Sequence, residues 1–92
     1  LMKCGGLYRG GQISTLAENF GMTCMVGCMM ETKIAITAGL SLVAARKNIT
    51  EADCDSFLYY KDADNGMPGG FERDGDMFRL LDKPGLGLEI SF

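Results

Sequence analysis

Two aspartates, Asp53 and Asp55, are the residues of this chain whose type and spacing most directly suggest chemistry. They follow a helix-like stretch of sequence and are separated only by Cys54. In an extended backbone alternate side chains share a face, so the two carboxylates would point the same way. Such a pair forms a small site for a cation, and the cation that it holds would decide the function. On sequence alone, a cap for the following turn is the commoner use of such aspartates.

Acid–base chemistry in this chain cannot use histidine, because the sequence contains none. The commonest general base and the commonest metal ligand are therefore both missing. Proton transfer would fall to Lys, Asp, Glu or Cys side chains. Lys3, which stands just before a Gly-Gly turn, is one candidate. Without further information, a solvated lysine at the end of a strand is the simpler interpretation of this residue.

The composition is that of one small domain and argues against several classes of partner. The 92 residues carry a net charge of −3 and no basic cluster, so nucleic acid is not expected to bind. No apolar run reaches the ~18 residues needed to span a membrane, so no membrane partner is expected. The chain starts on Leu1, and the absence of a signal peptide therefore says little.

The four cysteines indicate reduced thiols. They are Cys4, Cys24, Cys28 and Cys54. None forms a Cys-x-x-Cys pair, so a zinc site or a redox motif is not expected. Mostly buried, reduced thiols predict a cytoplasmic protein, and a disulfide framework is the minority alternative.

The apolar pattern predicts alternating strands and helices. A strand would end at residues 1–3, and a helix would follow and stop at Gly21. The apolar face of this helix would consist of Ile13, Leu16, Ala17 and Phe20. A strand buried on both faces is expected over residues 22–26, a second helix over 33–47 and a third strand over 49–56. This order predicts an α/β fold in which helical crossovers join parallel strands.

Two glycine pairs, Gly5-Gly6 and Gly10-Gly11, surround the start of the first expected helix. Backbone amides at such a place could cradle a phosphate. Because neither pair belongs to a known phosphate-binding pattern, tight turns are the expected structure.

Polar residues fall where each expected strand ends, at Lys3, Glu31 and Asp55. Their spacing is close to the unit of roughly 30 residues that builds an eight-fold β/α barrel, whose active site lies at the strand ends. A doubly wound open sheet also fits the local pattern. Three strands cannot close a barrel, so most of such a barrel would be absent from this chain.

The last third of the sequence predicts loops and a hairpin. Residues 61–70 are rich in glycine and other breakers of regular structure. Residues 71–73 and 77–80 flank Asp74-Gly75-Asp76, a pattern typical of a β-hairpin. A further turn is expected at residues 84–87.

Three motifs resemble, in order and spacing, those of the dipeptide epimerases of the enolase superfamily, of the L-Ala-D/L-Glu epimerase type. They are Leu1-Met2-Lys3-Cys4-Gly5-Gly6, Gly27-Cys28-Met29-Met30-Glu31-Thr32-Lys33 and Asp53-Cys54-Asp55. The resemblance covers the whole chain and corresponds to roughly the C-terminal quarter of a family member. It implies a partial (β/α) TIM-type barrel, in which residues 1–60 run from the end of the sixth strand to the eighth. Residues 61–92 would form a loop, a hairpin and a tail that returns toward the capping domain.

The resemblance also implies a reaction, the removal and return of the proton α to a dipeptide carboxylate through an enediolate that Mg²⁺ stabilises. Lys3 matches the catalytic lysine of the sixth strand. Asp53 and Asp55 match the pair that grips the α-ammonium group of the dipeptide. The three acidic Mg²⁺ ligands and the second lysine of the family would lie upstream of Leu1. The 92 residues alone are therefore expected neither to epimerise dipeptides nor to bind Mg²⁺ tightly.

Three residues after the middle strand have further roles by resemblance. Cys28 and Met30 match positions that line the substrate pocket, and Glu31 would orient neighbouring groups. Glu31 could equally be a first-turn acid that suits the dipole of the second helix. The implied partner is a small dipeptide, whose second residue the sequence does not specify, and the full-length protein could form a homo-oligomer.

Two other interpretations stay open at this point. Another enzyme of the superfamily, such as an o-succinylbenzoate synthase or a cycloisomerase, would use similar lysines but would not need the paired aspartates. A free-standing α/β module without chemistry would also fit the local pattern, and it predicts cooperative unfolding of the isolated chain.

Overall fold

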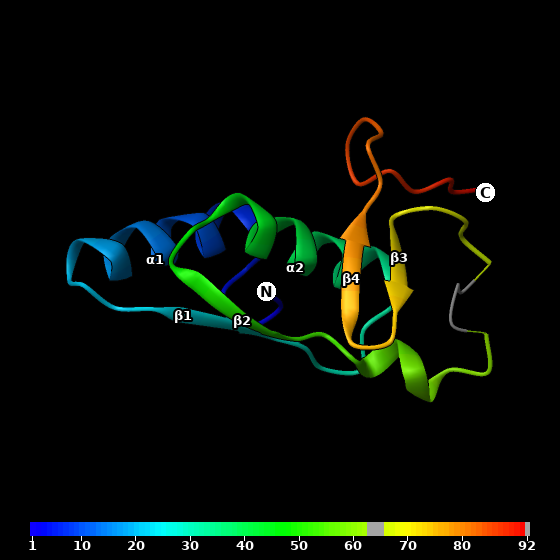
Figure 1. Cartoon of the computed structure of the whole chain (residues 1–92), viewed down its shortest axis with the longest axis horizontal. Helices are drawn as coiled ribbons and strands as arrows, with labels where there is room; N and C mark the ends of the chain where they lie inside the picture. The colour runs from blue at the N-terminus through cyan, green and yellow to red at the C-terminus, as the bar shows by residue number, and fades with distance from the viewer. Residues whose placement is uncertain (63–65, 92) are drawn as a thin grey trace.

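The computed structural model describes residues 1–62 and 66–91, which form two helices, a parallel strand pair and an antiparallel hairpin. Figure 1 shows the helices lying along one side of the parallel pair and the hairpin standing near one end of the second helix. The elements in chain order are α1 (Leu7–Asn19), β1 (Cys24–Gly27), α2 (Lys33–Ala45), β2 (Ile49–Asp53), the 3-10 helix η1 (Ser56–Tyr59), β3 (Phe71–Asp74) and β4 (Met77–Leu80).

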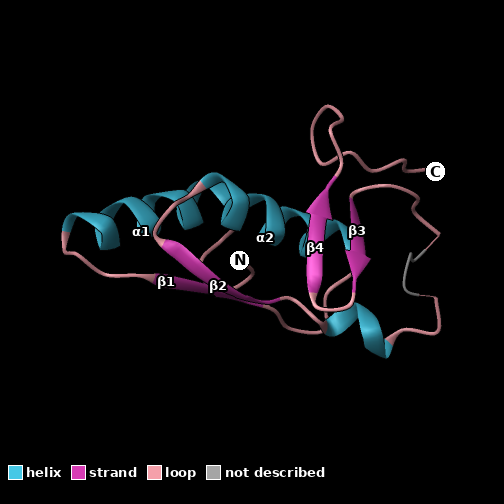
Figure 2. Ribbon diagram, viewed as in Figure 1, coloured by secondary structure: helices cyan, strands magenta, loops and turns pink. Residues whose placement is uncertain are grey.

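Strands β1 and β2 are parallel neighbours, and α2 is the crossover between them (Figure 2). Their register pairs Cys24 with Ile49 and Gly27 with Asp53. The predicted order of strand, helix and parallel strand is therefore confirmed for this unit. None of the helices in the described ranges is long and apolar enough to cross a membrane.

The core forms where α2 packs against this strand pair. Ile36 is fully buried, and Leu40, Val26 and Ile49 are also buried. A Cβ atom added to Gly39 would lie 3.3 Å from a methyl group of Val26. The glycine thus lets the helix approach β1 closely.

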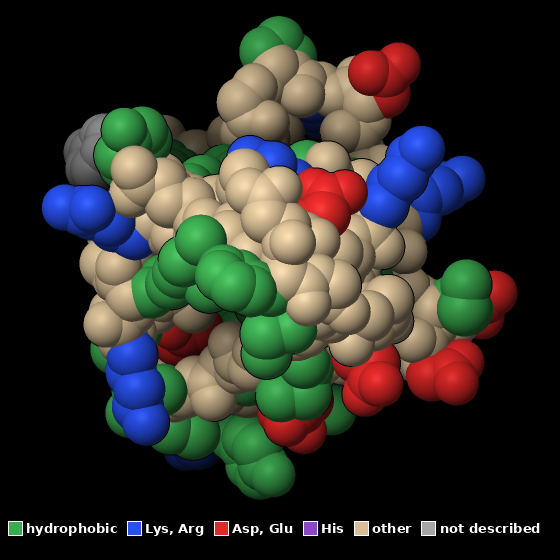
Figure 3. Space-filling view, turned by 90° about the vertical axis from the view of Figure 1, so that its left-hand side faces the viewer, with side chains coloured by type: hydrophobic (Ala, Val, Ile, Leu, Met, Phe, Trp, Pro, Cys, Tyr) green, Lys and Arg blue, Asp and Glu red, His purple; other side chains and the backbone are tan. Residues whose placement is uncertain are grey.

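Helix α1 turns a different face inward from the one that its sequence predicts. Gly10, Gly11 and Ser14 are its buried residues. The expected apolar face is open, since Ile13 is 53% exposed and Phe20 is 74% exposed. This prediction is wrong because small side chains let α1 pack tightly on α2, and residues 1–62 and 66–91 do not cover the apolar face. Figure 3 shows hydrophobic side chains in a band across the end of the molecule.

Close helix packing also explains the second glycine pair. Both Gly10 and Gly11 lie inside α1, so the tight turn expected there does not exist. A Cβ atom at Gly10 would stand 2.9 Å from Leu42, and one at Gly11 would stand 3.2 Å from the guanidinium of Arg46. Gly5 and Gly6 do lie in a turn and bend before the helix. Packing, rather than phosphate binding, accounts for Gly10 and Gly11.

Three strand predictions need correction. Residues 1–3 form no strand, because their backbone enters a turn in which the amide of Gly6 donates to the carbonyl of Leu1 at 3.1 Å. The middle strand covers residues 24–27 and is buried on one face only, since Met25 is 58% exposed. The third strand ends at Asp53, not at residue 56. The second helix likewise ends two residues early, at Ala45.

The predicted hairpin is present as β3 and β4, which pair Phe71 with Leu80 and Asp74 with Met77. The rings of Phe57, Phe71 and Phe78 meet edge to face, with centroids 5.4 to 5.9 Å apart. Such contacts stabilise a core beyond the area that they bury. The trio fastens the hairpin to η1.

Two further contacts attach the C-terminal region to α2. The buried ammonium group of Lys33 lies 5.5 Å from the ring centroid of Phe71, a favourable cation–π geometry. A Cβ atom at Gly70 would stand 2.7 Å from the hydroxyl of Thr37, so only glycine fits between helix and hairpin. The predicted turn at residues 84–87 is confirmed by the hydrogen bond from the amide of Gly87 to the carbonyl of Pro84. Residues 63–65 of the predicted loop, and residue 92, lie outside the described residues.

Candidate active site

An open cleft of about 720 Å³ lies at the carboxyl ends of β1 and β2. Three segments form its walls: the N-terminal turn, the loop after β1 and the segment after β2. The lining residues are Leu1, Met2, Lys3, Gly27, Cys28, Met29, Met30, Glu31, Asp55, Ser56 and Tyr59. The cleft combines apolar walls with one amine and two carboxylates, the usual composition of a site for a small polar ligand.

Five of the six residues predicted for the site line this cleft. Lys3 comes from the N-terminal turn, Cys28, Met30 and Glu31 from the loop after β1, and Asp55 from the segment after β2. Parallel strands end at the same edge of a sheet, which is why residues far apart in the sequence meet here. A lysine and an aspartate thus border one cavity from separate segments.

Asp53 is not among the residues that line the cleft. It is the last residue of β2, is exposed and pairs with Gly27. Asp55 lies beyond the strand, with φ −106° and ψ −3°, so the backbone between the two acids does not continue as a strand. Alternate side chains share a face only while the chain stays extended. The spacing of two residues therefore does not by itself bring both carboxylates to the cavity.

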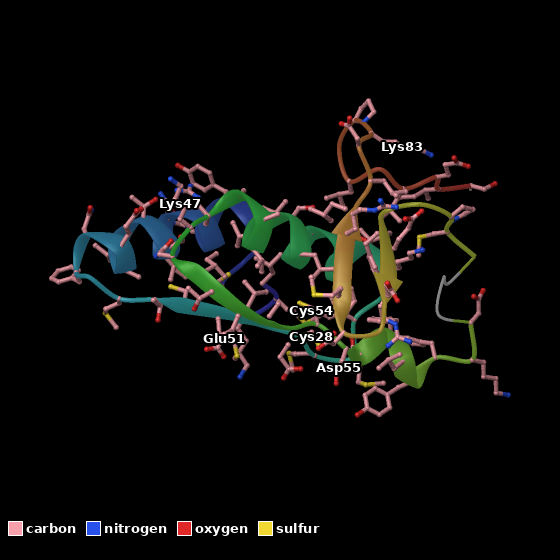
Figure 4. The ribbon with its side chains drawn as sticks, viewed as in Figure 1. Cys28, Lys47, Glu51, Cys54, Asp55 and Lys83 are labelled. Carbon is pink, nitrogen blue, oxygen red and sulfur yellow. The ribbon has the colours of Figure 1, made fainter. Side chains whose placement is uncertain are left out.

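The Asp55 carboxylate is directed toward the loop after β1. It accepts a hydrogen bond from the Cys28 thiol, with 3.7 Å between Sγ and Oδ1. Asp55 is the N-cap residue of η1, but its side chain makes no capping hydrogen bond. Figure 4 shows Cys28, Cys54 and Asp55 together where the two strands end. Because its side chain does not cap η1, the simplest structural explanation for Asp55 does not hold.

Cys54 is a buried thiol behind the cleft and is only 4% exposed. Burial raises the pKa of this thiol to about 11, and the nearby charges of Cys28, Glu31 and Asp53 contribute to the increase. The thiolate is the nucleophilic form of cysteine, so Cys54 is inert at neutral pH. All four cysteines are free, as the sequence predicts.

Glu31 closes the loop after β1 and is only 5% exposed. It precedes Thr32, the N-cap residue of α2, so it is not an acid of the first helical turn. Its backbone is tied to the opposite wall, since its amide donates to the Ser56 hydroxyl at 3.2 Å. The alternative helix-dipole interpretation of this residue is therefore wrong.

Comparison with known proteins shows the family of this chain. The sequence matches the enolase C-terminal domain-like family over residues 1–92. The chain belongs to that family. Its homologues include L-Ala-D/L-Glu and other dipeptide epimerases of the enolase superfamily, and the N-succinyl-L-Arg/Lys racemase of Bacillus cereus, which is 38% identical over 99% of this chain and 24% of the relative. The L-Ala-D/L-Glu epimerase of Clostridium acetobutylicum is 43% identical over 89 residues, which are 97% of this chain and 24% of the relative.

Solved structures of enolase-family epimerases have the same fold in this region. The substrate-liganded complex of the L-Ala-D/L-Glu epimerase from Bacillus subtilis superposes with a TM-score of 0.88 at 40% identity, covering 95% of this chain and 24% of that one. The dipeptide epimerase from Methylococcus capsulatus, complexed with Mg and the dipeptide L-Arg-D-Lys, gives 0.86 at 38% identity, with the same coverage. The chain thus matches the C-terminal part of these structures and spans about a quarter of their length.

Six residues that line the cleft of this enolase-family chain were not predicted for the site: Leu1, Met2, Gly27, Met29, Ser56 and Tyr59. Tyr59 stands four residues after Asp55, as the last residue of η1. The apolar turn Phe57-Leu58-Tyr59 after the second aspartate was the available signal, but its helical form was not predicted. Ser56 offered no pattern in the sequence.

Proposed function

We propose that the protein is a dipeptide epimerase and that this chain supplies one catalytic base and part of the substrate site. The observation that carries the proposal is the position of Lys3 and Asp55 on a single cleft, in a chain homologous to dipeptide epimerases. Residues 1–60 are then the last part of a (β/α) barrel, from the end of the sixth strand to the eighth. Residues 61–92 lead back toward a capping domain.

Lys3 moves the proton in this proposal. Its amine removes the α-proton from one face of the dipeptide or returns it to that face. Epimerisation needs an acid–base group on the other face as well, and a lysine outside these 92 residues provides it. Positioned proton transfer of this kind contributes typically 10²- to 10⁴-fold to a rate. The open, partly apolar cleft leaves room for a dipeptide between Lys3 and Asp55.

Asp55 holds the ammonium group of the dipeptide, with Asp53 as its partner. A carboxylate and an ammonium form charge-assisted hydrogen bonds, which are about twice as strong as neutral ones. The Asp55 side chain is suited to this role because it borders the cleft and does not cap η1. Asp53 would have to turn toward the ligand, since it does not line the cleft here. Cys28 and Met30 line the substrate site beside the ammonium.

The described side chains of this chain do not form a site for Mg²⁺. Among residues 1–62 and 66–91, no three His, Cys, Asp or Glu side chains gather as a metal site. The Methylococcus capsulatus relative was solved with Mg, and the whole protein is proposed to use the same ion through ligands outside these residues. A bound Mg²⁺ would supply stabilisation of the charge that develops on the substrate carboxylate.

The test uses the full-length protein encoded by the reading frame that contains these residues. Asp55→Asn keeps the size of the side chain and removes its charge, so kcat/KM for L-Ala-L-Glu epimerisation is expected to fall about 10- to 100-fold, the range for hydrogen bonds to charged groups. Asp76→Asn is the matched control, because Asp76 is an exposed residue of the hairpin turn. Equal activities of the two variants would remove the ammonium-binding role and favour a superfamily enzyme that needs no paired aspartates.

A further inference from the structure

We propose that Ser56 and Tyr60 are positioning residues whose hydroxyls hold the loop after β1 against Asp55. The inference rests on the proposed function, because it assigns these groups a part in binding the dipeptide. The loop in question is residues 28–31, which supplies Cys28 and Met30 to the cleft. Neither hydroxyl is placed in contact with the reacting atoms.

Ser56 makes the inner contact. Its side chain is 3% exposed, and its hydroxyl accepts from the amide of Glu31 at 3.2 Å. The same hydroxyl donates to the carbonyl of Glu31 at 3.3 Å. One buried side chain therefore bonds both backbone groups of a residue 25 positions away. The Glu31 amide also donates to the carbonyl of Met29 at 2.8 Å within the loop. Ser56 is therefore the contact that joins the end of the loop to the opposite wall of the cleft.

Tyr60 makes the outer contact. Its hydroxyl donates to the carbonyl of Met30 at 3.2 Å. The helix η1 sets the spacing between Ser56 and Tyr60. The amide of Tyr60 extends the last turn of this helix by donating to the carbonyl of Phe57 at 3.3 Å. Ser56 and Tyr60, four residues apart, thus bond consecutive residues of the opposite loop. Two such bonds fix both the position and the direction of the loop.

A third contact joins the start of the loop to Asp55. The Cys28 thiol donates to Asp55 at 3.7 Å, a weak bond from a sulfur donor. Both ends of the loop are consequently tied to residues 55–60. The turn that carries Lys3 is closed by its own bonds between residues 1 and 6. Loosening residues 28–31 is therefore expected to disturb substrate binding more than proton transfer by Lys3.

The experiment compares Ser56→Ala, Tyr60→Phe and the double variant in the full-length protein encoded by the reading frame. We expect KM for L-Ala-L-Glu to rise about threefold for Tyr60→Phe, which loses one neutral hydrogen bond, and about tenfold for Ser56→Ala, which loses two, with kcat within about twofold. Because both bonds hold one loop, the double variant should differ from the product of the single effects.

Two control variants separate positioning from general stability. Ser41→Ala removes a hydroxyl that donates to the carbonyl of Thr37 at 2.8 Å inside α2, remote from the cleft. Tyr8→Phe removes a hydroxyl from a residue that is 77% exposed on α1. Both should leave KM unchanged even where they lower the melting temperature. A parallel fall in kcat with unchanged KM in the Ser56 and Tyr60 variants would overturn the positioning role.

Amide hydrogen exchange tests the same contacts without a measurement of enzyme activity. Exchange at residues 29–31 should rise several-fold in Ser56→Ala and stay at the wild-type rate in Ser41→Ala, since the first variant alone loses a bond to the Glu31 amide. If the wild-type protein did not epimerise dipeptides, the proposed function would be refuted. Faster exchange at residues 29–31 in Ser56→Ala would in that case still establish the contact between Ser56 and the loop. Unchanged exchange in an active enzyme would overturn the inference and leave the proposed function intact.

Discussion

The parallel pair β1–β2 and the hairpin β3–β4 differ in what their side chains do. The parallel pair ends at a cleft that holds an amine and two carboxylates, and one of its faces is open at Met25 and Glu51. The hairpin instead contributes two rings to a closed aromatic trio with Phe57. The parallel pair thus borders the proposed site, whereas the hairpin packs against η1. Function and stability should therefore respond to different substitutions.

The largest effect on activity is expected from substitution of Lys3. Lys3→Ala in the full-length protein should lower kcat for dipeptide epimerisation by about 10²- to 10⁴-fold, because it removes an acid–base group. Its melting temperature should stay close to that of the wild type, since Lys3 is exposed. Lys47→Ala is the matched control, because Lys47 is an exposed lysine in the turn before β2, away from the cleft (Figure 4). Equal kcat values for the two variants would contradict the role of Lys3.

Substitutions in the hairpin should instead lower the stability of the protein. Phe71→Ala removes a ring that is 9% exposed and contacts two others, so the free energy of unfolding should fall by about 3–5 kcal/mol. Urea denaturation of the full-length protein measures the change. Met77→Ala on the neighbouring strand is the control, because Met77 is 69% exposed and its loss should cost less than about 0.5 kcal/mol. If both variants lost the same stability, the aromatic trio would not be what attaches the hairpin.

The smallest effect concerns pH and the thiol behind the cleft. The pKa of Cys54 is about 11 in the folded chain, against an ordinary value of 9.0. Below pH 9 the thiol is neutral in both states, so its contribution to stability is constant. Between pH 9 and 11 the unfolded thiol ionises first, and the free energy of unfolding should decrease as pH rises. Cys54→Ala should flatten this decrease when the free energy of unfolding is measured by urea denaturation across this pH range.

Sequence patterns predicted the elements that depend on local chemistry. The run Asp74-Gly75-Asp76 between alternating residues was sufficient for the hairpin. Apolar periodicity and order predicted a helix over residues 33–47 between two strands, and the structure has the helix over 33–45 between parallel strands. Lys3, Cys28, Met30 and Glu31 were expected at the cleft from the family resemblance of their motifs, and they line it. These features require only information from residues close together in the chain.

Features that depend on tertiary contacts were not predicted. Periodicity identifies Ile13 and Phe20 as apolar, but it does not say whether a surface exists to cover them. The spacing of Asp53 and Asp55 implies a shared face only if the strand continues, and the strand ends at Asp53. The bonds from Ser56 and Tyr60 join residues 25 and 30 positions apart. No local pattern could indicate these pairs.

The most direct test of the central claim is a crystal structure of the full-length protein with Mg²⁺ and L-Ala-L-Glu bound. We predict that the ammonium nitrogen of the dipeptide lies within hydrogen-bond distance of the Asp55 carboxylate. We also predict that the Lys3 amine faces the α-carbon of the second residue. A dipeptide bound with its ammonium group away from Asp55, or with Lys3 turned from that carbon, would contradict the proposed role of this cleft.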